Sequence, residues 1–152
     1  MMRAHPDFAG RTIPTHLTLG DYRLRILTIA DLAEDYDAVV ESVEDLKGVF
    51  DDGSWPEGLT REEDLVDLGW HQKEFSLNRS FAWIIADPQN DGYLGCAYVF
   101  PPQDADHPAE AWFWFRTSIR AAVDEAGFRR AFERWLHGPV WPSYRFRIIS
   151  PT

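Results

Sequence analysis

The stretch Phe81–Phe100 reads FAWIIADPQNDGYLGCAYVF and decides the fold, because two apolar runs flank one short polar segment. Phe81–Ala86 is short and almost wholly apolar, as a buried strand is, and Tyr93–Phe100 repeats that character. Between them, Asp87–Gly92 contains the Pro, Asn, Asp and Gly residues that favour a turn. The stretch therefore predicts a β-hairpin near the middle of the chain.

Three further strands are expected on either side of this hairpin. Tyr22–Ile29 and Tyr144–Ile149 alternate apolar and polar residues, which is typical of a half-buried strand. Ala109–Thr117 (AEAWFWFRT) alternates as well, and it follows a polar loop that begins at Pro101-Pro102. Residues 1–20 show no period and are expected to form an irregular N-terminal arm, with residues 21–152 as a single domain.

Three helices are predicted from apolar residues spaced three and four apart. The first follows Asp31, and Leu32, Tyr36 and Val39 lie on its apolar side. The second opens with a Thr60-x-x-Glu63 capping box and ends near Asn78, with Leu65, Leu68, Trp70 and Phe75 forming a loose apolar side. The third runs over Arg120–His137. The order is β-α-α-β-β-β-α-β, which is that of one layered α/β domain.

Composition excludes several classes of function. The formal net charge of −10, from 25 acidic and 15 basic residues, argues against binding to nucleic acid or to an anionic membrane. The single cysteine, Cys96, allows no intrachain disulfide, and we interpret it as a buried structural residue. No apolar run is long enough for a membrane helix and no signal peptide is evident, so a cytoplasmic protein is expected.

Several of these stretches, in this order, resemble the GNAT N-acetyltransferase family. YRLRILTIADLAEDY (residues 22–36) resembles its opening strand and helix, and the hairpin resembles its second and third strands, with Gly95 at a frequent glycine position. AEAWFWFR (residues 109–116) resembles its fourth strand. The resemblance implies a mixed, mostly antiparallel central sheet with helices on both faces, and transfer of an acetyl group from acetyl-CoA to an amine.

The segment that follows the fourth strand departs from the family pattern. The resemblance implies glycines there that admit the CoA pyrophosphate, whereas Val123 and Glu125 stand at those positions. Arg116, Arg120 and Arg129 are the candidate cofactor-binding residues, because guanidinium groups pair well with phosphates. Few residues follow Ile149, so a shortened family member with a degenerate CoA phosphate-binding loop is expected.

Glu110 is the candidate catalytic base, because the resemblance implies a carboxylate in the fourth strand that deprotonates the amine. The alternative is that Glu110 is a solvent-facing strand residue. No tyrosine matches the family's catalytic acid, and Tyr98 and Tyr144 are expected to pack in the sheet. The five histidines show no metal-ligand spacing, so no metal site is expected.

The acceptor amine is expected at two groups of residues. Asp51, Asp52 and Trp55 belong to a loop between the first two helices, a region that the resemblance places beside the acceptor site. Trp112 and Trp114 share one face of a strand, where they either line a pocket or form core beneath a helix.

Three functional interpretations remain open at the level of sequence. The first is an acetyltransferase that uses acetyl-CoA and acts on a small amine or a peptide. The second is a non-catalytic GNAT-like module that binds a ligand or a protein. The third is a homodimer that forms through an uncovered strand edge, for which Tyr144–Ile149 is the candidate.

Overall fold

A computed structural model describes residues 3–152 and shows one six-stranded sheet in the order β1-β2-β3-β4-β5-β6. Neighbouring strands pair antiparallel except β5 and β6, which pair parallel. The predicted hairpin is confirmed as β3 and β4, in which Phe81 pairs with Val99. The strands are β1 (His16–Leu19), β2 (Tyr22–Ile26), β3 (Phe81–Ala86), β4 (Tyr93–Phe100), β5 (Ala109–Phe115) and β6 (Phe146–Ile149).

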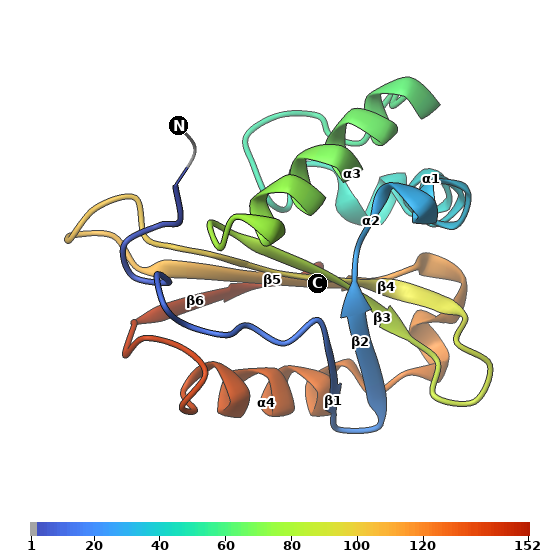
Figure 1. Ribbon diagram of the computed structural model, residues 1–152. Coiled ribbons are helices and arrows are strands. Elements are labelled where there is room, and N and C mark those ends of the chain that lie inside the picture. The colour runs from blue at the N-terminus through green and yellow to red at the C-terminus, as the bar shows by residue number, and fades with distance from the viewer. Residues whose placement is uncertain (1–2) are drawn as a thin grey trace.

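Helices cover both faces of this sheet (Figure 1). On one face lie α1 (Leu32–Glu41), α2 (Val43–Leu46) and α3 (Arg61–Ser76), and on the other lies α4 (Glu125–Leu136). Two 3-10 helices, η1 (Ile29–Asp31) and η2 (Thr117–Ala122), precede α1 and α4. This arrangement confirms the predicted mixed, mostly antiparallel α/β class.

Two capping motifs set the helix starts, and the one at Thr60 was predicted. Thr60 and Glu63 bond reciprocally at the start of α3, with backbone-to-side-chain distances of 3.0 and 3.1 Å. Thr28 and Asp31 form the same kind of box before η1, where the Thr28 backbone N–H donates to Asp31 Oδ2 at 2.9 Å. Each box satisfies N–H groups that have no partner within the helix.

The sheet separates two layers of core. Under α4, aromatic side chains such as Trp83, Phe113 and Phe128 form the first layer. Under α1 and α3, Ile84, Cys96 and other residues form the second. Successive residues of β3 and β4 alternate between the layers, as the pleat requires. Both strands are therefore apolar on both faces, and this produces the two apolar runs from which the hairpin was predicted.

The structure differs from the prediction at three element boundaries. The arm was expected to be irregular up to residue 20, yet His16–Leu19 pair with β2 through a two-residue turn in which Gly20 has a φ of +57°. The last helix begins at Glu125 rather than at Arg120, because η2 and an extended Val123 precede it. The last strand begins at Phe146 rather than at Tyr144.

β6 is one outer strand of the sheet, as the prediction of an uncovered edge requires. Homodimer formation through this edge stays a prediction. Within residues 3–152, no helix is long and apolar enough to cross a membrane.

Candidate functional site

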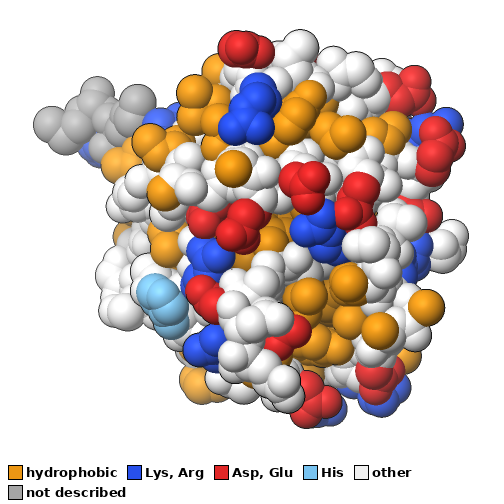
Figure 2. Space-filling model, turned by 90° about the vertical axis from the view of Figure 1, so that its right-hand side faces the viewer, with side chains coloured by type: hydrophobic (Ala, Val, Ile, Leu, Met, Phe, Trp, Pro, Cys, Tyr) orange, Lys and Arg blue, Asp and Glu red, His pale blue; other side chains and the backbone are white. Residues whose placement is uncertain are grey.

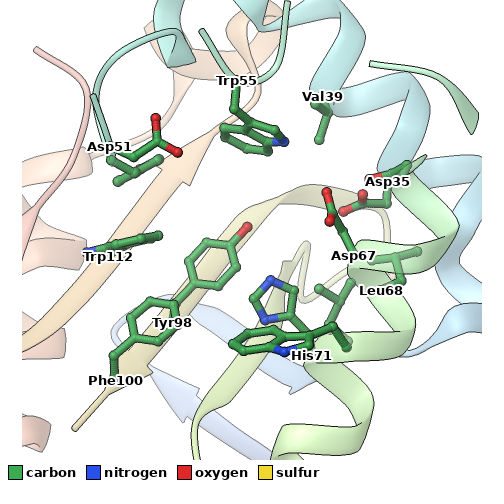
Figure 3. Close-up of a pocket in the computed structure, with 14 residues that line it drawn as sticks. Asp35, Val39, Asp51, Trp55, Asp67, Leu68, His71, Tyr98, Phe100 and Trp112 are labelled. Atoms are coloured by element: carbon green, nitrogen blue, oxygen red, sulfur yellow. The ribbon is translucent and has the colours of Figure 1, made fainter. Parts of the chain in front are cut away.

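A cavity of about 290 Å³ lies between α1, α3 and the sheet, and it is partly covered by the loop that joins α2 to α3 (Figure 3). Its wall is built from apolar and aromatic side chains together with four aspartates and one histidine. The lining residues are Leu27, Asp35, Val39, Phe50, Asp51, Trp55, Asp64, Asp67, Leu68, Trp70, His71, Tyr98, Phe100 and Trp112. These residues come from six separate segments of the chain, so no single sequence motif identifies the site.

One side of the cavity is aromatic. Phe50 stacks on Trp112 with ring centroids 4.9 Å apart and an interplanar angle of 16°. Phe100 packs against the same indole at 4.5 Å, and Tyr98 lies 5.9 Å from it. Trp55 faces this group across the cavity (Figure 3). Rings arranged in this way present π faces that attract cations.

The opposite side carries the carboxyl groups of Asp35 of α1 and Asp67 of α3 (Figure 3). Asp64 of α3, which also lines the cavity, lies beside Asp35. Asp35 and Asp64 are only 4% and 2% exposed. Burial, and then the neighbouring Asp64 carboxyl, raises the pKa of Asp35 well above its ordinary value. Burial also raises the pKa values of Asp64 and Asp67. Two adjoining buried carboxyls favour sharing one proton, because like charges at close range repel each other.

Beneath the cavity a chain of buried polar groups fixes the Asp35 carboxyl. The Tyr93 hydroxyl donates to Asp35 Oδ1 at 2.5 Å and lies 2.8 Å from Cys96 Sγ. Beside it, Trp114 Nε1 donates to the Tyr98 hydroxyl at 3.1 Å. Burial raises the pKa of the Cys96 thiol well above its ordinary value, so the residue is a protonated structural cysteine rather than a nucleophile.

His71 completes the wall as a neutral group. Its ring packs 5.3 Å from that of Tyr98, and burial lowers the pKa of the imidazole to about 4. At pH 7 it therefore carries no charge. Among residues 3–152, no lysine or arginine lines the cavity. The cavity is thus lined by acidic groups without a cationic one, and it has an aromatic side and an acidic side.

Three of the five residues predicted to bind the amine meet in this cavity, namely Asp51, Trp55 and Trp112. The other two do not line it. Asp52 is exposed on the loop, and Trp114 is fully buried beneath the floor. Trp114 and Trp112 do share a face of β5, but only Trp112 reaches the open space.

The acidic side was not predicted, although α3 held a signal for it. Asp64, Leu68, His71 and Phe75 recur at spacings of four and three, which places them on one helix face. The predicted apolar side was partly wrong, since Leu65 and Trp70 are each 43% exposed. The face toward the sheet is mixed, with polar and apolar residues in turn, so a search for an apolar stripe misses it.

Glu110, the candidate base, lies on β5 outside this cavity. Its Oε1 accepts a hydrogen bond from Trp112 Nε1 at 3.0 Å, and its Oε2 is 4.0 Å from Arg147. It borders a separate hollow, to which Trp112 also contributes. Glu110 therefore holds the Trp112 indole in place and does not itself face the amine-sized space.

The three predicted cofactor-binding arginines are all engaged within the chain. Arg116 contacts two carboxylates of α1, at 2.7 Å from Asp37 and 2.5 Å from Glu41. The other two make equally local contacts. Arg120 pairs with Asp45 and Glu125 at 3.3 and 3.2 Å, and Arg129 donates to the Ile148 carbonyl and the Ser150 hydroxyl at 2.8 and 3.1 Å.

The residues present do not fit the CoA that the family resemblance implies. Two backbone N–H groups after β5 are already satisfied, since Thr117 donates to Ser42 Oγ at 3.1 Å and Ser118 donates to Glu41 Oε2 at 2.8 Å. At the start of α4, the Asp124 side chain accepts from the Gly127 N–H at 2.9 Å. Donors that a pyrophosphate would need are therefore occupied.

Comparison with known proteins gives no match to a protein-family model and no curated protein of similar sequence. Solved structures do match. The ribosomal L7/L12 alpha-N-protein acetyltransferase RimL in complex with coenzyme A has a TM-score of 0.62 at 15% identity, over 82% of this chain and 66% of that one. In the comparison with an apo crystal form of RimL, the match covers 63% of the RimL chain. This chain therefore spans less than two thirds of the length of RimL in both structures.

Two further structures support the same conclusion. The microcin C7 self-immunity acetyltransferase MccE, in complex with acetyl-CoA and AMP, has a TM-score of 0.66 at 11% identity over 90% of this chain and 73% of its own. A putative GnaT-family acetyltransferase from Bordetella pertussis has a TM-score of 0.55 at 14% identity, over 90% and 78%. At these identities the likeness concerns the fold, and the chain has the fold of the GNAT N-acetyltransferases.

Proposed function

We propose that this chain binds a small organic cation, a protonated amine, in the cavity between α1, α3 and the sheet. The observation that carries the proposal is the chemistry of the wall, in which aspartates face aromatic rings and His71 stays neutral. A cation gains from both sides at once, through charge attraction to the aspartates and through the faces of the rings. An anion would be attracted neither by the aspartates nor by the faces of the rings.

The size of the cavity supports a small ligand. A volume of about 290 Å³ lies at the lower end of the range for small-molecule sites, and its mostly apolar lining with a few polar groups is typical of them. The indole of Trp112 is held by Glu110, and Asp35 is held by Tyr93, so both sides of the site are in place before a ligand arrives. Such preorganisation lowers the entropic cost of binding.

The test is a titration with a matched set of probes. n-Butylammonium and tetramethylammonium are compared with butanol, which is neutral, and with butyrate, which is anionic. We expect calorimetric heat and a raised Tm for the cations alone, and weaker binding with a smaller rise in Tm in Trp112→Leu. Glu62→Gln serves as the control, since Glu62 is an exposed acid of α3 that does not line the cavity. Equal binding of butanol or butyrate would contradict the electrostatic argument.

Transfer of an acetyl group from acetyl-CoA to the bound amine is the second candidate function. The GNAT fold favours it, with Glu110 as the candidate base, but Glu110 borders a separate hollow and not the amine cavity. The occupied arginines weigh against it. The assay is release of free thiol from acetyl-CoA in the presence of each amine that binds, with Glu110→Gln as the variant. Turnover that depends on both the amine and Glu110 would place acetyl transfer ahead of simple binding.

A further inference from the structure

We infer that carboxylates of α1 and α2 act as built-in anions at the segment between β5 and α4, and that this chain consequently does not bind CoA. The inference goes beyond the binding of an amine, and it concerns a different part of the molecule. It rests on the hydrogen bonds and charges around Arg116, Thr117, Ser118 and Arg120.

The first step concerns the donors. Glu41 accepts from Arg116 and from the backbone N–H of Ser118, at 2.5 and 2.8 Å. Asp45 accepts from the Thr117 hydroxyl at 2.6 Å. These contacts combine guanidinium, backbone amide and hydroxyl donors around carboxylate oxygens, which is the donor set that also recognises a phosphate. The carboxylates thus fill an anion-binding arrangement from within the chain.

The second step concerns the charge. Two guanidinium groups, of Arg116 and Arg120, meet four carboxylates, of Asp37, Glu41, Asp45 and Glu125, so the cluster has a net charge of 2 − 4 = −2. The hydrogen bond from Arg116 lowers the pKa of Glu41 to about 2, so this carboxylate stays ionised at neutral pH. A diphosphate brought to the cluster would meet net repulsion.

The charge pattern is visible on the surface. Figure 2 views the end of the molecule at the right of Figure 1, where α1 and the segment after β5 come together. Central lysine and arginine side chains on this face border aspartates and glutamates instead of forming a continuous basic patch. An incoming polyanion therefore finds no continuous cationic patch at the centre of this face.

The third step concerns the start of α4, where a helix dipole would otherwise favour an anion. Asp124 caps this end itself, and a Cβ atom on Gly127 would lie 2.3 Å from Asp124 Oδ2. The absence of a side chain at Gly127 thus leaves space for the Asp124 carboxylate that caps α4. Nearby, Arg120 and Arg129 also bond the Pro151 and Ile148 carbonyls, which ties the last residues to α4.

The cluster has a structural consequence for the amine pocket. Asp37 and Glu41 belong to α1, the helix that carries Asp35 into the cavity wall. By pairing with Arg116 at the end of β5, they fix α1 against the sheet. The anion-binding arrangement therefore serves to position the pocket wall, and it is no longer available to a cofactor.

The experiment compares the whole chain with the double variant Asp37→Asn, Glu41→Gln. Coenzyme A and inorganic pyrophosphate are titrated into each protein by calorimetry, with RimL, which is known in complex with coenzyme A, as the positive control. For the wild-type chain we expect no binding tighter than about 1 mM, a thousandfold weaker than a micromolar site. In the double variant, which removes two negative charges beside Arg116 and weakens the contacts that hold it, we expect pyrophosphate affinity to rise at least about tenfold.

Micromolar binding of CoA to the wild-type chain would overturn the inference, and so would a double variant that folds but gains no pyrophosphate affinity. If the double variant does not fold, backbone amide NMR of the wild type decides the question. We expect the Thr117 and Ser118 signals to stay unchanged in millimolar pyrophosphate, and clear shifts would refute the proposal. Glu44→Gln is the matched control, because Glu44 lies on α2 but pairs only with Lys47. Amine binding is measured separately without CoA, so its failure is distinguishable from failure here.

Discussion

Replacing Asp64 by Asn should stabilise the protein at neutral pH, because the carboxylate is costly where it lies. Asp64 is 2% exposed, its Oδ2 has no hydrogen-bond donor among the described residues, and Asp35 adjoins it. A buried polar atom without a partner costs about 1–3 kcal/mol. Asn removes the charge and provides an N–H₂ group that can donate to Asp35. We expect a gain of about 1–2 kcal/mol at pH 8, since an amide keeps part of the burial cost.

The effect has a defined pH dependence. The pKa values of Asp35 and Asp64 are raised in the folded state, so protonation of these carboxyls favours folding. Their contribution to stability is fully present below the ordinary pKa of 3.8 and is lost as pH rises through the raised folded values. The advantage of Asp64→Asn should therefore be small at pH 4 and should grow toward pH 8.

Urea unfolding of both proteins at pH 4, 6 and 8 measures this difference, and Tm should rise by about 2–4 °C for each kcal/mol gained. Glu62→Gln, an exposed change in the same turn of α3, controls for the loss of negative charge at the helix start. A variant that is less stable than wild type at pH 8 would refute the reasoning, since it would mean that the Asp64 carboxylate is favourably paired. The same variant should bind n-butylammonium at least about tenfold more weakly.

Three shorter predictions follow from other contacts. Trp112→Leu should weaken cation binding about twofold to thirtyfold by calorimetry, because one cation–π contact contributes about 0.5–2 kcal/mol; no change would mean that the ring does not touch the ligand. Gly95→Ala should cost at least about 2–3 kcal/mol in urea unfolding, because its Cβ would lie 1.9 Å from the Trp114 carbonyl oxygen, and wild-type stability would contradict this contact. The hydrogen bond from Arg116 lowers the pKa of Glu41 from 4.5 to about 2, so its contribution of about 1–2 kcal/mol should be present above pH 4.5 and lost toward pH 2; a Glu41→Gln deficit that persists unchanged at pH 2 would count against this.

The sequence was sufficient for the hairpin and the helix starts because both depend on local chemistry. Thr60 and Glu63 are three residues apart and cap the same turn, so their role is visible without any tertiary contact. β1 was missed, although its turn at Gly20 and Asp21 is equally local, because a strand of four residues is too short to show a clear alternation. Element boundaries failed where a 3-10 turn replaced a helix, as in Thr117–Ala122.

The candidate site was only half predictable, and the reason is physical. Asp51 and Trp55 were identified from the family resemblance, which places their loop beside the acceptor site, and Trp112 was identified from strand alternation. Asp35 and Asp64 were not, because an acid in the first turn of a helix is ordinarily a solvated partner of the helix dipole. Whether such an acid is buried depends on what packs over it, and only the folded chain brings α1 and α3 together above β4.

The location of the acids separates their two roles. Where a carboxylate meets a guanidinium, as Glu41 meets Arg116, its pKa falls and the contact supports the fold. Where Asp35 and Asp64 lie buried beside each other, burial raises the pKa of both carboxyls, and the fold bears a cost when they ionise. Residues that break the local rules of stability are expected at functional sites, and here both border the same cavity. The uncompensated negative charge is thus concentrated where a cation would restore the balance, which is the physical reason to look for the ligand there first.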